Sequence, residues 1–410
     1  MVSHIEPISS HSLPVAVATS LRARCALLLA GTLVALASGE GLLRVLERRA
    51  RAEAASAAVE EDDPALGRRP QPLGPGRDAW GFRNERVPQV AELIAIGDSQ
   101  TWGVNASRQE AWPQRVQAIT GRTTYNMSWG GYGTVQYEVL AQRAQALSPR
   151  VLIVGLYFGN DLYESYRLVY TRQAHASLRR GDAGELLPDT IGPRADSLWR
   201  EHEEFQRVYG RDQPARWGLW FRGHTAVGRL FDRTLGRDQS AWFEIGKAWA
   251  RAHPDHGAFI DAAGARTVFT TAYRLLAVDL EDPRIAEGLR LTTVSLDKIA
   301  GLAARRGVRL LVVLIPTKER VYAERVRRAR HGGLDPTYAT LVVDEEKCQN
   351  QIESLLQQHR IEALALLPVL REAVARGEPV YPPTTESHPS ALGYQVIAQA
   401  VARRVAELDW

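Results

Sequence analysis

The chain is poor in cysteine, carries no large excess of charge, and has no uncharged apolar run of transmembrane length. Of its 410 residues, two are cysteines. Cys25 lies in an N-terminal apolar run, which leaves Cys348 alone in the globular part and excludes a disulfide framework or a cysteine-based metal site. The net charge is +4 and the arginines are scattered, so we expect no nucleic-acid partner.

The N-terminal apolar segment leaves three interpretations open. Residues 25–39 are uncharged but shorter than the roughly 20 residues that a spanning helix needs. That length is reached over residues 21–43, with charges near both ends. We expect a membrane anchor at 21–43, preceded by a loose tail at 1–20. The alternatives are a cleaved signal peptide, for which Ala-Leu-Ala at 35–37 offers a cleavage pattern, and a helix that does not span.

The charges that flank this segment argue against export. By the positive-inside rule alone, the excess of arginines after the segment would leave the C-terminal side in the cytoplasm. Long domains nevertheless cross membranes largely regardless of flanking charge, and we therefore expect an exported domain. Arg22 and Arg24 precede the run, and Arg44, Arg48, Arg49 and Arg51 follow it.

A stalk and linker are expected at residues 44–76. Residues 44–70 are rich in Ala, Arg and Glu, which predicts a helix. The proline- and glycine-rich stretch 69–76 ends this helix. We therefore place the globular domain at residues 77–410.

Short apolar runs alternate with helical patterns in the globular part. Continuous apolar strands separated by helices indicate a parallel sheet covered on both faces, so we expect a three-layer α/β/α fold with about five strands. The expected strands are 93–96, about 123–127, 151–158, 308–315 and 361–366, and the expected helices are about 110–120, 135–147, 288–306 and 391–408.

Residues 165–285 break this alternation and are predicted to be a large insertion after the third strand. Its aromatic residues form either a small core of the insertion or a lip that binds a sugar or an acyl chain. His253 and His256 lie three positions apart, but a metal site needs a third ligand, and we predict no metal. The tryptophans of the insertion are Trp199, Trp217, Trp220, Trp242 and Trp249.

Polar residues follow the expected strands, where a parallel sheet binds its ligands. Ser99 follows the first strand, Gly130-Gly131 the second, and Asn160 the third. A serine hydroxyl becomes a nucleophile when a base takes its proton. The backbone N–H groups of Ser99 and Gly131 and the Asn160 amide are candidate donors to an oxyanion. The alternative is that the glycines only form a turn and that Asn160 caps the next segment.

His388 is the candidate base. It lies in the stretch Thr385-Glu386-Ser387-His388, just before the last expected helix. A lone histidine is usually structural, but this one opens the last helix of a repeated strand–helix pattern, where the carboxyl ends of the strands gather the other candidates.

These blocks, in this order, resemble the SGNH/GDSL hydrolase family. The resemblance implies a flavodoxin-like SGNH domain that transfers acyl groups through Ser99 and needs no cofactor. Gly131 matches the oxyanion glycine of the family, with Gly130 as a close rival. The matching blocks are residues 97–101 with the nucleophile, 126–134 with the oxyanion glycine, 159–161 with the oxyanion asparagine, and the stretch that ends in His388 with the base; the resemblance covers about 93–164 and 288–405.

One position departs from the family pattern. Family members usually carry an aspartate two or three positions before the histidine, whereas this chain has Thr385 and Glu386. Glutamate orients the catalytic histidine in some other hydrolases, and Glu386 is therefore the candidate acid. Alternatively, a backbone carbonyl holds the imidazole and Glu386 is a solvated loop charge.

Two further segments, 80–83 and 315–319, are similar to membrane-anchored bacterial members and to proteins that O-acetylate alginate outside the cytoplasm. This similarity implies an inner-membrane protein with a periplasmic domain and an acylated saccharide as its ester-bearing substrate. Lys318 would contact an anionic saccharide or pair with Glu319 at the surface. The chain would be an esterase or, with the same residues, an O-acyltransferase; a non-catalytic saccharide-binding relative is the alternative from another class.

Cell fractionation tests the expected anchor and its orientation. We expect a full-length, membrane-bound protein whose C-terminal domain is digested by protease added outside the inner membrane. A shortened soluble product that begins near Ser38 would show a cleaved signal peptide instead. Protection in intact spheroplasts would show that the arginines after the apolar run decide the orientation.

Overall fold

The computed structural model describes residues 60–74, 76–181, 239–262, 265–329 and 334–408, together with Gly31. All of these except Gly31 belong to one compact unit. Apart from Gly31, the expected tail and membrane segment and the first part of the stalk therefore lie outside the described residues. Within the described ranges, no helix is long and apolar enough to cross a membrane.

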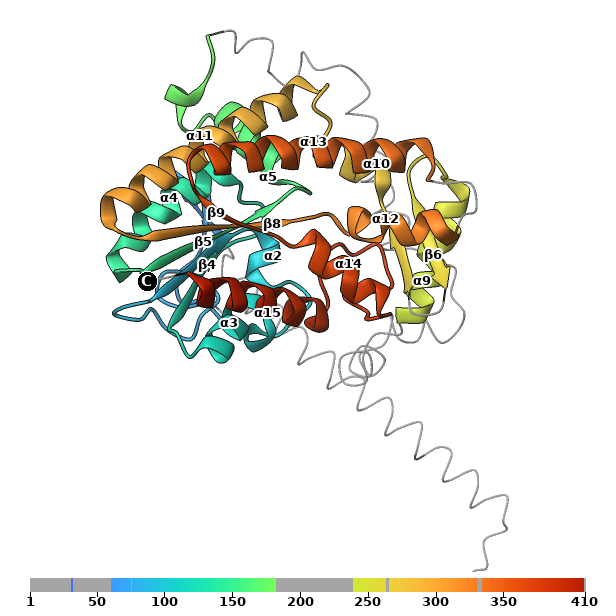
Figure 1. Ribbon diagram of the computed structural model, residues 1–410, viewed down its shortest axis with the longest axis horizontal. Helices are drawn as coiled ribbons and strands as arrows, with labels where there is room; N and C mark the ends of the chain where they lie inside the picture. The colour runs from blue at the N-terminus through green and yellow to red at the C-terminus, as the bar shows by residue number, and fades with distance from the viewer. Residues whose placement is uncertain are drawn as a thin grey trace, which may run out of the picture. The chain divides into compact units, whose positions relative to one another are not determined.

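Five parallel strands form the central sheet, in the order β4-β3-β5-β8-β9 (Figure 1). Every residue of β3, β4 and β5 is buried, as expected of strands that are covered on both faces. The predicted parallel α/β fold is confirmed. The strands are Leu93–Gly97 (β3), Thr124–Ser128 (β4), Val151–Tyr157 (β5), Arg309–Ile315 (β8) and Glu362–Ala365 (β9).

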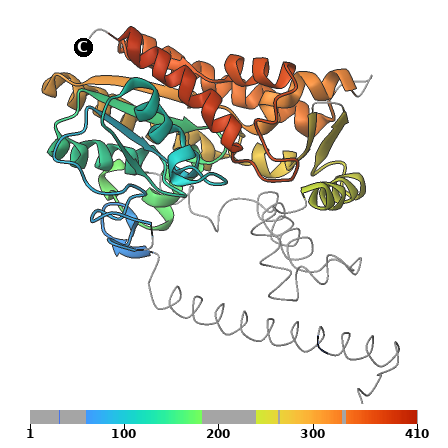
Figure 2. The ribbon, with the colours of Figure 1, turned by 90° about the horizontal axis from the view of Figure 1, so that it is seen from below.

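Helices cover both faces of this sheet. In Figure 1, α4, α5, α11 and α13 lie above it, and α3 and α15 lie below it; Figure 2 shows α15 (red) crossing the lower face. The helices on the sheet domain are Ser99–Trp102 (α2), Arg108–Glu110 (η1), Trp112–Thr120 (α3), Thr134–Ala144 (α4), Gln145–Leu147 (η2), Asp161–Tyr166 (α5), Pro283–Arg306 (α11), Lys318–Ala329 (α12), Pro336–Gln358 (α13), Leu367–Ala375 (α14) and Ala391–Glu407 (α15).

Capping residues mark where the longest helices begin and end. Asp282 accepts a hydrogen bond from the Arg284 N–H at the start of α11, and Gly307 ends this helix in the left-handed conformation. Ser390 caps α15 in the same way, by accepting from the Gly393 N–H. These caps satisfy backbone groups that a helix end leaves without partners, and Ser390, two residues after His388, fixes the start of α15.

Residues 60–70 form a β-hairpin, so the expected helical stalk is wrong for this segment. Glu60–Asp63 (β1) pairs antiparallel with Gly67–Pro70 (β2). Helix propensity is a weak prior, and here the charged side chains find partners in the hairpin and beyond it. Glu61 pairs with Arg69 across the two strands, and Asp63 pairs with Arg143 of α4.

The hairpin packs on the sheet domain, which therefore begins before residue 77. The Trp129 indole N–H donates to Glu60 over 2.7 Å, and the Tyr132 hydroxyl donates to the Arg68 carbonyl over 2.9 Å. Figure 2 shows the hairpin (blue) beside the green segment near residue 170, where His175 donates from Nε2 to the Ala65 carbonyl. The hairpin thus braces the loop that carries Gly130 and Gly131.

The predicted insertion is described at its two ends. Of its tryptophans, Trp249 is buried with Phe243 and Val268 in a small core, and Trp242 is 40% exposed; Trp199, Trp217 and Trp220 lie outside the described residues. The described part thus contains the small core that the sequence suggested as one alternative. Its elements are Arg167–Thr171 (η3), Ala176–Leu178 (η4), Gln239–Ala252 (α9), Ala258–Ala262 (β6), Ala265–Phe269 (β7) and Thr271–Leu275 (α10).

The β6–β7 hairpin of the insertion also supports the loop before His388. Thr267 of β7 donates its hydroxyl to the Pro382 carbonyl over 2.8 Å, and the Val268 N–H donates to the Thr384 carbonyl over 3.4 Å. The end of the insertion is therefore part of the structure that surrounds the candidate site.

Candidate active site

Ser99 lies on a sharp turn between β3 and α2. Asp98 caps α2 by accepting the Gln100 N–H, and both of these neighbours are buried, whereas Ser99 is half-buried. The turn packs tightly on the sheet, because a Cβ added at Gly97 or Gly155 would lie 2.1 or 2.5 Å from Thr101 Oγ1. Paired glycines on β3 and β5 thus make room for Thr101 and leave Ser99 facing outward.

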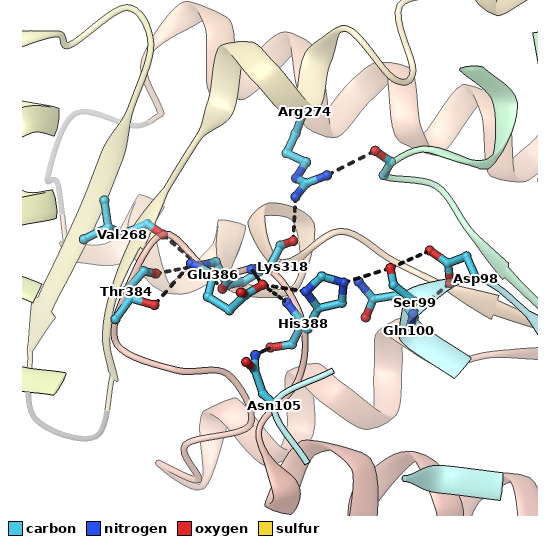
Figure 3. A network of polar contacts seen from close by, with 12 residues as sticks. Asp98, Ser99, Gln100, Asn105, Val268, Arg274, Lys318, Thr384, Glu386 and His388 are labelled. Carbon is cyan, nitrogen blue, oxygen red and sulfur yellow. Dashed lines mark hydrogen bonds and ion pairs between the residues drawn. The ribbon is translucent and has the colours of Figure 1, made fainter. Parts of the chain in front are cut away.

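The structure brings Ser99, His388 and Glu386 into one hydrogen-bonded chain (Figure 3). His388 Nε2 lies 2.8 Å from Ser99 Oγ, and His388 Nδ1 lies 2.5 Å from Glu386 Oε1. Glu386 Oε1 also accepts the backbone N–H groups of Ser387 and His388, at 2.9 and 3.1 Å. The longer glutamate side chain therefore folds back over its own loop and reaches the imidazole.

Glu386 is ionised in this arrangement. Burial acts to raise its pKa, but hydrogen bonds from the His388 side chain and backbone, with the charges of His388 and Lys318, outweigh burial and lower the pKa of Glu386 to about 2. A carboxylate that accepts from Nδ1 leaves Nε2 as the basic nitrogen toward Ser99.

Asp98 is a second carboxylate next to the nucleophile. It is fully buried, and burial raises its pKa, while hydrogen bonds from Gln100, Ser99 and Asn160 act in the opposite direction. Ser99 Oγ lies 3.2 Å from Asp98 Oδ2, farther than it lies from His388. We infer that Asp98 holds the turn and that His388 is the base.

Asn160 lies near this turn, where its side chain acts to lower the pKa of Asp98. Its buried amide oxygen has no partner among the described residues. The amide nitrogen carries two hydrogens that it can donate to an oxyanion.

Gly130 and Gly131 form a turn opposite Ser99. The Tyr132 N–H donates to the Trp129 carbonyl, and Gly131 has φ +72°, which favours glycine. A Cβ added at Gly130 would lie 3.9 Å from the Ser99 Cβ. Neither glycine donates its N–H to another described residue. Gly131 is thus required by the turn, and Gly130 is the glycine that faces the nucleophile.

Lys318 occupies neither of the places expected from the sequence. Its side chain is fully buried, and its ammonium group donates to the carbonyls of Val268, Thr384 and Glu386, at 2.7, 2.8 and 2.9 Å. Glu319 is buried as well. The expected contact with a saccharide is therefore wrong, since the ammonium group is enclosed by the protein and already uses its donors.

Sequence reasoning missed two features of the site. Trp102 and Trp129 meet edge to face with ring centroids 6.3 Å apart, beside Ser99 and Gly130, whereas the sequence suggested an aromatic lip in the insertion. Arg274 lies half-buried between the loops that carry Asn160 and His388. The tryptophans could have been noticed next to the motifs, but no motif marks Arg274.

Among the described residues, no three His, Cys, Asp or Glu side chains are grouped so that they could hold a metal ion. The His253 ring instead lies against the Trp249 ring, with centroids 5.9 Å apart.

Residues 269–410 match the family model described as "SGNH hydrolase-like domain, acetyltransferase AlgX". The resemblance to SGNH hydrolases is confirmed. The match includes His388, Glu386 and Lys318, and it begins inside the predicted insertion, at the end of β7. With the triad geometry it bears out the prediction of an SGNH-type enzyme that acts on ester bonds. No curated protein matches the chain.

Several solved structures are similar to the chain at low sequence identity. A G-D-S-L lipolytic protein from Veillonella parvula is 10% identical, covers 77% of this chain and 98% of its own, and has a TM-score of 0.34. An acetylxylan esterase from Geobacillus stearothermophilus is 10% identical, with coverages of 79% and 97% and a TM-score of 0.35. A GDSL-like lipase from Bacteroides thetaiotaomicron is 8% identical, with coverages of 78% and 92% and a TM-score of 0.34.

Replacement of Glu386 tests its role in the triad. Glu386→Gln removes the charge and presents an amide that can turn its N–H₂ toward Nδ1, so kcat for a short-chain aryl ester should fall by about 10³-fold or more. Thr385→Ala is the matched control in the same loop and should stay near wild type. If both variants keep wild-type kcat, the site works as a Ser–His dyad.

Proposed function

We propose that this protein is a serine esterase of the SGNH type that acts on O-acetyl groups of a saccharide through an acyl-Ser99 intermediate. The observation that carries the proposal is the continuous chain of hydrogen bonds from Ser99 Oγ through His388 to Glu386, at 2.8 and 2.5 Å. The family description supports acetyl as the acyl group, since it names an acetyltransferase.

The geometry supports a two-step reaction. His388 Nε2 takes the proton of Ser99 as Oγ bonds to the ester carbonyl carbon. The oxygen that becomes negative is stabilised by the Ser99 N–H, by an N–H of the Gly130–Gly131 turn, and by the Asn160 amide. The C–O bond to the alcohol then breaks, and the alcohol leaves with the proton held by His388. In the second step His388 activates an acceptor hydroxyl, which takes the acyl group and frees Ser99.

The acceptor decides between two functions. With water the protein is an esterase, and with a sugar hydroxyl it is an O-acyltransferase. The O-acyltransferase is the alternative function, and it is supported by the family description, which names an acetyltransferase. Trp102 and Trp129, which lie half-buried beside Ser99, support a saccharide in either case, because aromatic faces suit the apolar faces of sugars. A non-catalytic saccharide-binding role accounts less well for the intact triad.

The location of the reaction is part of the proposal. A membrane anchor at residues 21–43 would hold the enzyme at the outer face of the inner membrane, where envelope polysaccharide is accessible. The rival is an exported, cleaved and soluble esterase for small esters. The apolar segment and the similarity of residues 80–83 and 315–319 to membrane-anchored members support the anchor, and the fractionation described above distinguishes the two.

A fluorophosphonate probe and an acetylated polysaccharide test the function together. The probe should label wild type and should not label Ser99→Ala, and acetylated polysaccharide should release acetate with wild type alone. The double variant Ser99→Ala/His388→Ala should be little worse than either single variant, because the two residues act as one unit. Ser354→Ala, on the exposed side of α13, is the matched serine control.

Substantial activity in Ser99→Ala would remove the nucleophile assignment. Labelled wild type that neither releases acetate nor transfers acetyl to deacetylated polysaccharide would leave a serine hydrolase with another substrate.

A further inference from the structure

A buried lysine, Lys318, and a half-buried arginine, Arg274, hold the catalytic loop, which we define as residues 384–388. Figure 3 shows the Lys318 ammonium group on the side of Glu386 away from Ser99, and Arg274 above the loop. Lys318 begins α12, and Arg274 belongs to α10 at the end of the insertion. Neither residue touches Ser99, and the reaction as proposed above does not use them. We call the pair the cationic clamp.

Lys318 binds the backbone of the catalytic loop. Its three N–H donors match three carbonyl oxygens, those of Val268, Thr384 and Glu386, each within 2.9 Å. The Phe269 ring lies 5.6 Å away and adds a cation–π contact. A neutral amine has only two N–H donors and would leave one of these carbonyls without its partner. Lys318 therefore ties the loop to β7 in its charged form.

The glutamate in the triad makes this anchoring important. Glutamate has one more rotatable bond than the aspartate usual in the family, so its carboxylate is harder to fix. Lys318 holds the carbonyl of Glu386 itself, and Glu386 Oε1 then binds the N–H groups of Ser387 and His388. The side chain is thus fixed at both ends, at its backbone and at its carboxylate.

Arg274 joins the two halves of the site. Its guanidinium donates to the Gly159 carbonyl over 3.1 Å and to the Ser387 hydroxyl over 2.5 Å. Gly159 directly precedes Asn160, and Ser387 directly precedes His388. One rigid, planar group therefore sets the spacing between the oxyanion donor and the base.

We propose that Lys318 and Arg274 are positioning residues that hold the catalytic loop and keep Glu386, His388 and Asn160 in reacting geometry. The proposal rests on the proposed function and concerns how this site is built. It gives β7, α10 and the start of α12 a role in positioning the catalytic loop.

The charges around the clamp give it a pH dependence. Burial lowers the pKa of Lys318 to about 8, and Arg274 acts in the same direction, while the carboxylates of Glu319 and Glu386 act to raise it. Burial also acts to lower the pKa of Arg274, but Tyr157 and Glu319 outweigh it and raise the pKa. Lys318 thus loses its proton on the alkaline side, whereas Arg274 stays charged.

The test compares clamp variants with Lys298→Met, which removes an exposed lysine paired with Glu138. Lys318→Met should lower kcat for an aryl ester by about 10²-fold with little change in KM, as expected when reacting groups are misplaced rather than removed. Wild-type kcat should fall above about pH 8, and Lys318→Arg should move this fall to higher pH. Lys298→Met should match wild type throughout.

Ser387→Ala tests the hydrogen bond that Arg274 donates to the catalytic loop, and it introduces no new group into the site. It removes one hydrogen bond to a charged donor and should lower kcat by about tenfold at unchanged KM. Circular dichroism shows whether the Lys318 variants fold. Ser387→Ala decides the proposal even if neither of them does. Wild-type kcat and pH profile in Ser387→Ala and in any folded Lys318 variant would overturn the clamp.

A readout without turnover separates this proposal from the proposed function. The proton shared by His388 Nδ1 and Glu386 should give a low-field proton NMR signal in wild type that weakens or exchanges faster in the clamp variants. An unchanged signal in those variants overturns the clamp. Wild type that shows the signal but does not react with fluorophosphonate overturns the proposed function instead.

Discussion

The short hydrogen bond between Glu386 and His388 is the contact on which the rest of the site depends. It fixes which imidazole nitrogen faces Ser99, and it is made by two residues of one short loop that has no regular structure of its own. Such a loop would ordinarily be mobile. Here β7, α10 and α12 hold it through partly buried hydrogen bonds, and the Ser390 cap of α15 fixes its far end. The base is therefore positioned by the tertiary structure around the loop.

The pKa shifts of the carboxyl groups at the site favour ionisation of Glu386 over that of Asp98 and Asp161. Glu386 has a lowered pKa, while burial raises the pKa of Asp98, and burial together with Asp98 raises that of Asp161. A carboxylate costs free energy to bury unless cations and donors surround it. Lys318 supplies such a charge on the Glu386 side of the site. Hydrogen bonds and nearby cations thus favour ionisation of Glu386, where the imidazole needs a partner, whereas burial opposes ionisation of Asp98 under the nucleophile.

The sequence predicted what local patterns determine and missed what distant contacts determine. Apolar runs predicted the strands of the sheet, and the turns that follow them predicted Ser99, Asn160 and His388 as neighbours. The helical stalk failed at residues 60–70, because cross-strand pairs and contacts with Trp129 and Arg143 outweigh a weak helix propensity. Lys318 was expected at the surface because a charged residue after a strand usually is, and its carbonyl partners come from segments that only the fold brings together. Arg274 joins loops more than a hundred positions away from it in the sequence, and no local pattern carries that information.

Covalent acyl transfer through Ser99 is the central claim, and mass spectrometry of enzyme quenched during turnover of an aryl acetate tests it most directly. The peptide that contains Ser99 should carry one acetyl group in wild type. The same peptide should be unmodified in Ser99→Ala and in His388→Ala. Turnover by wild type with Ser99 unmodified and another residue acetylated would contradict the account.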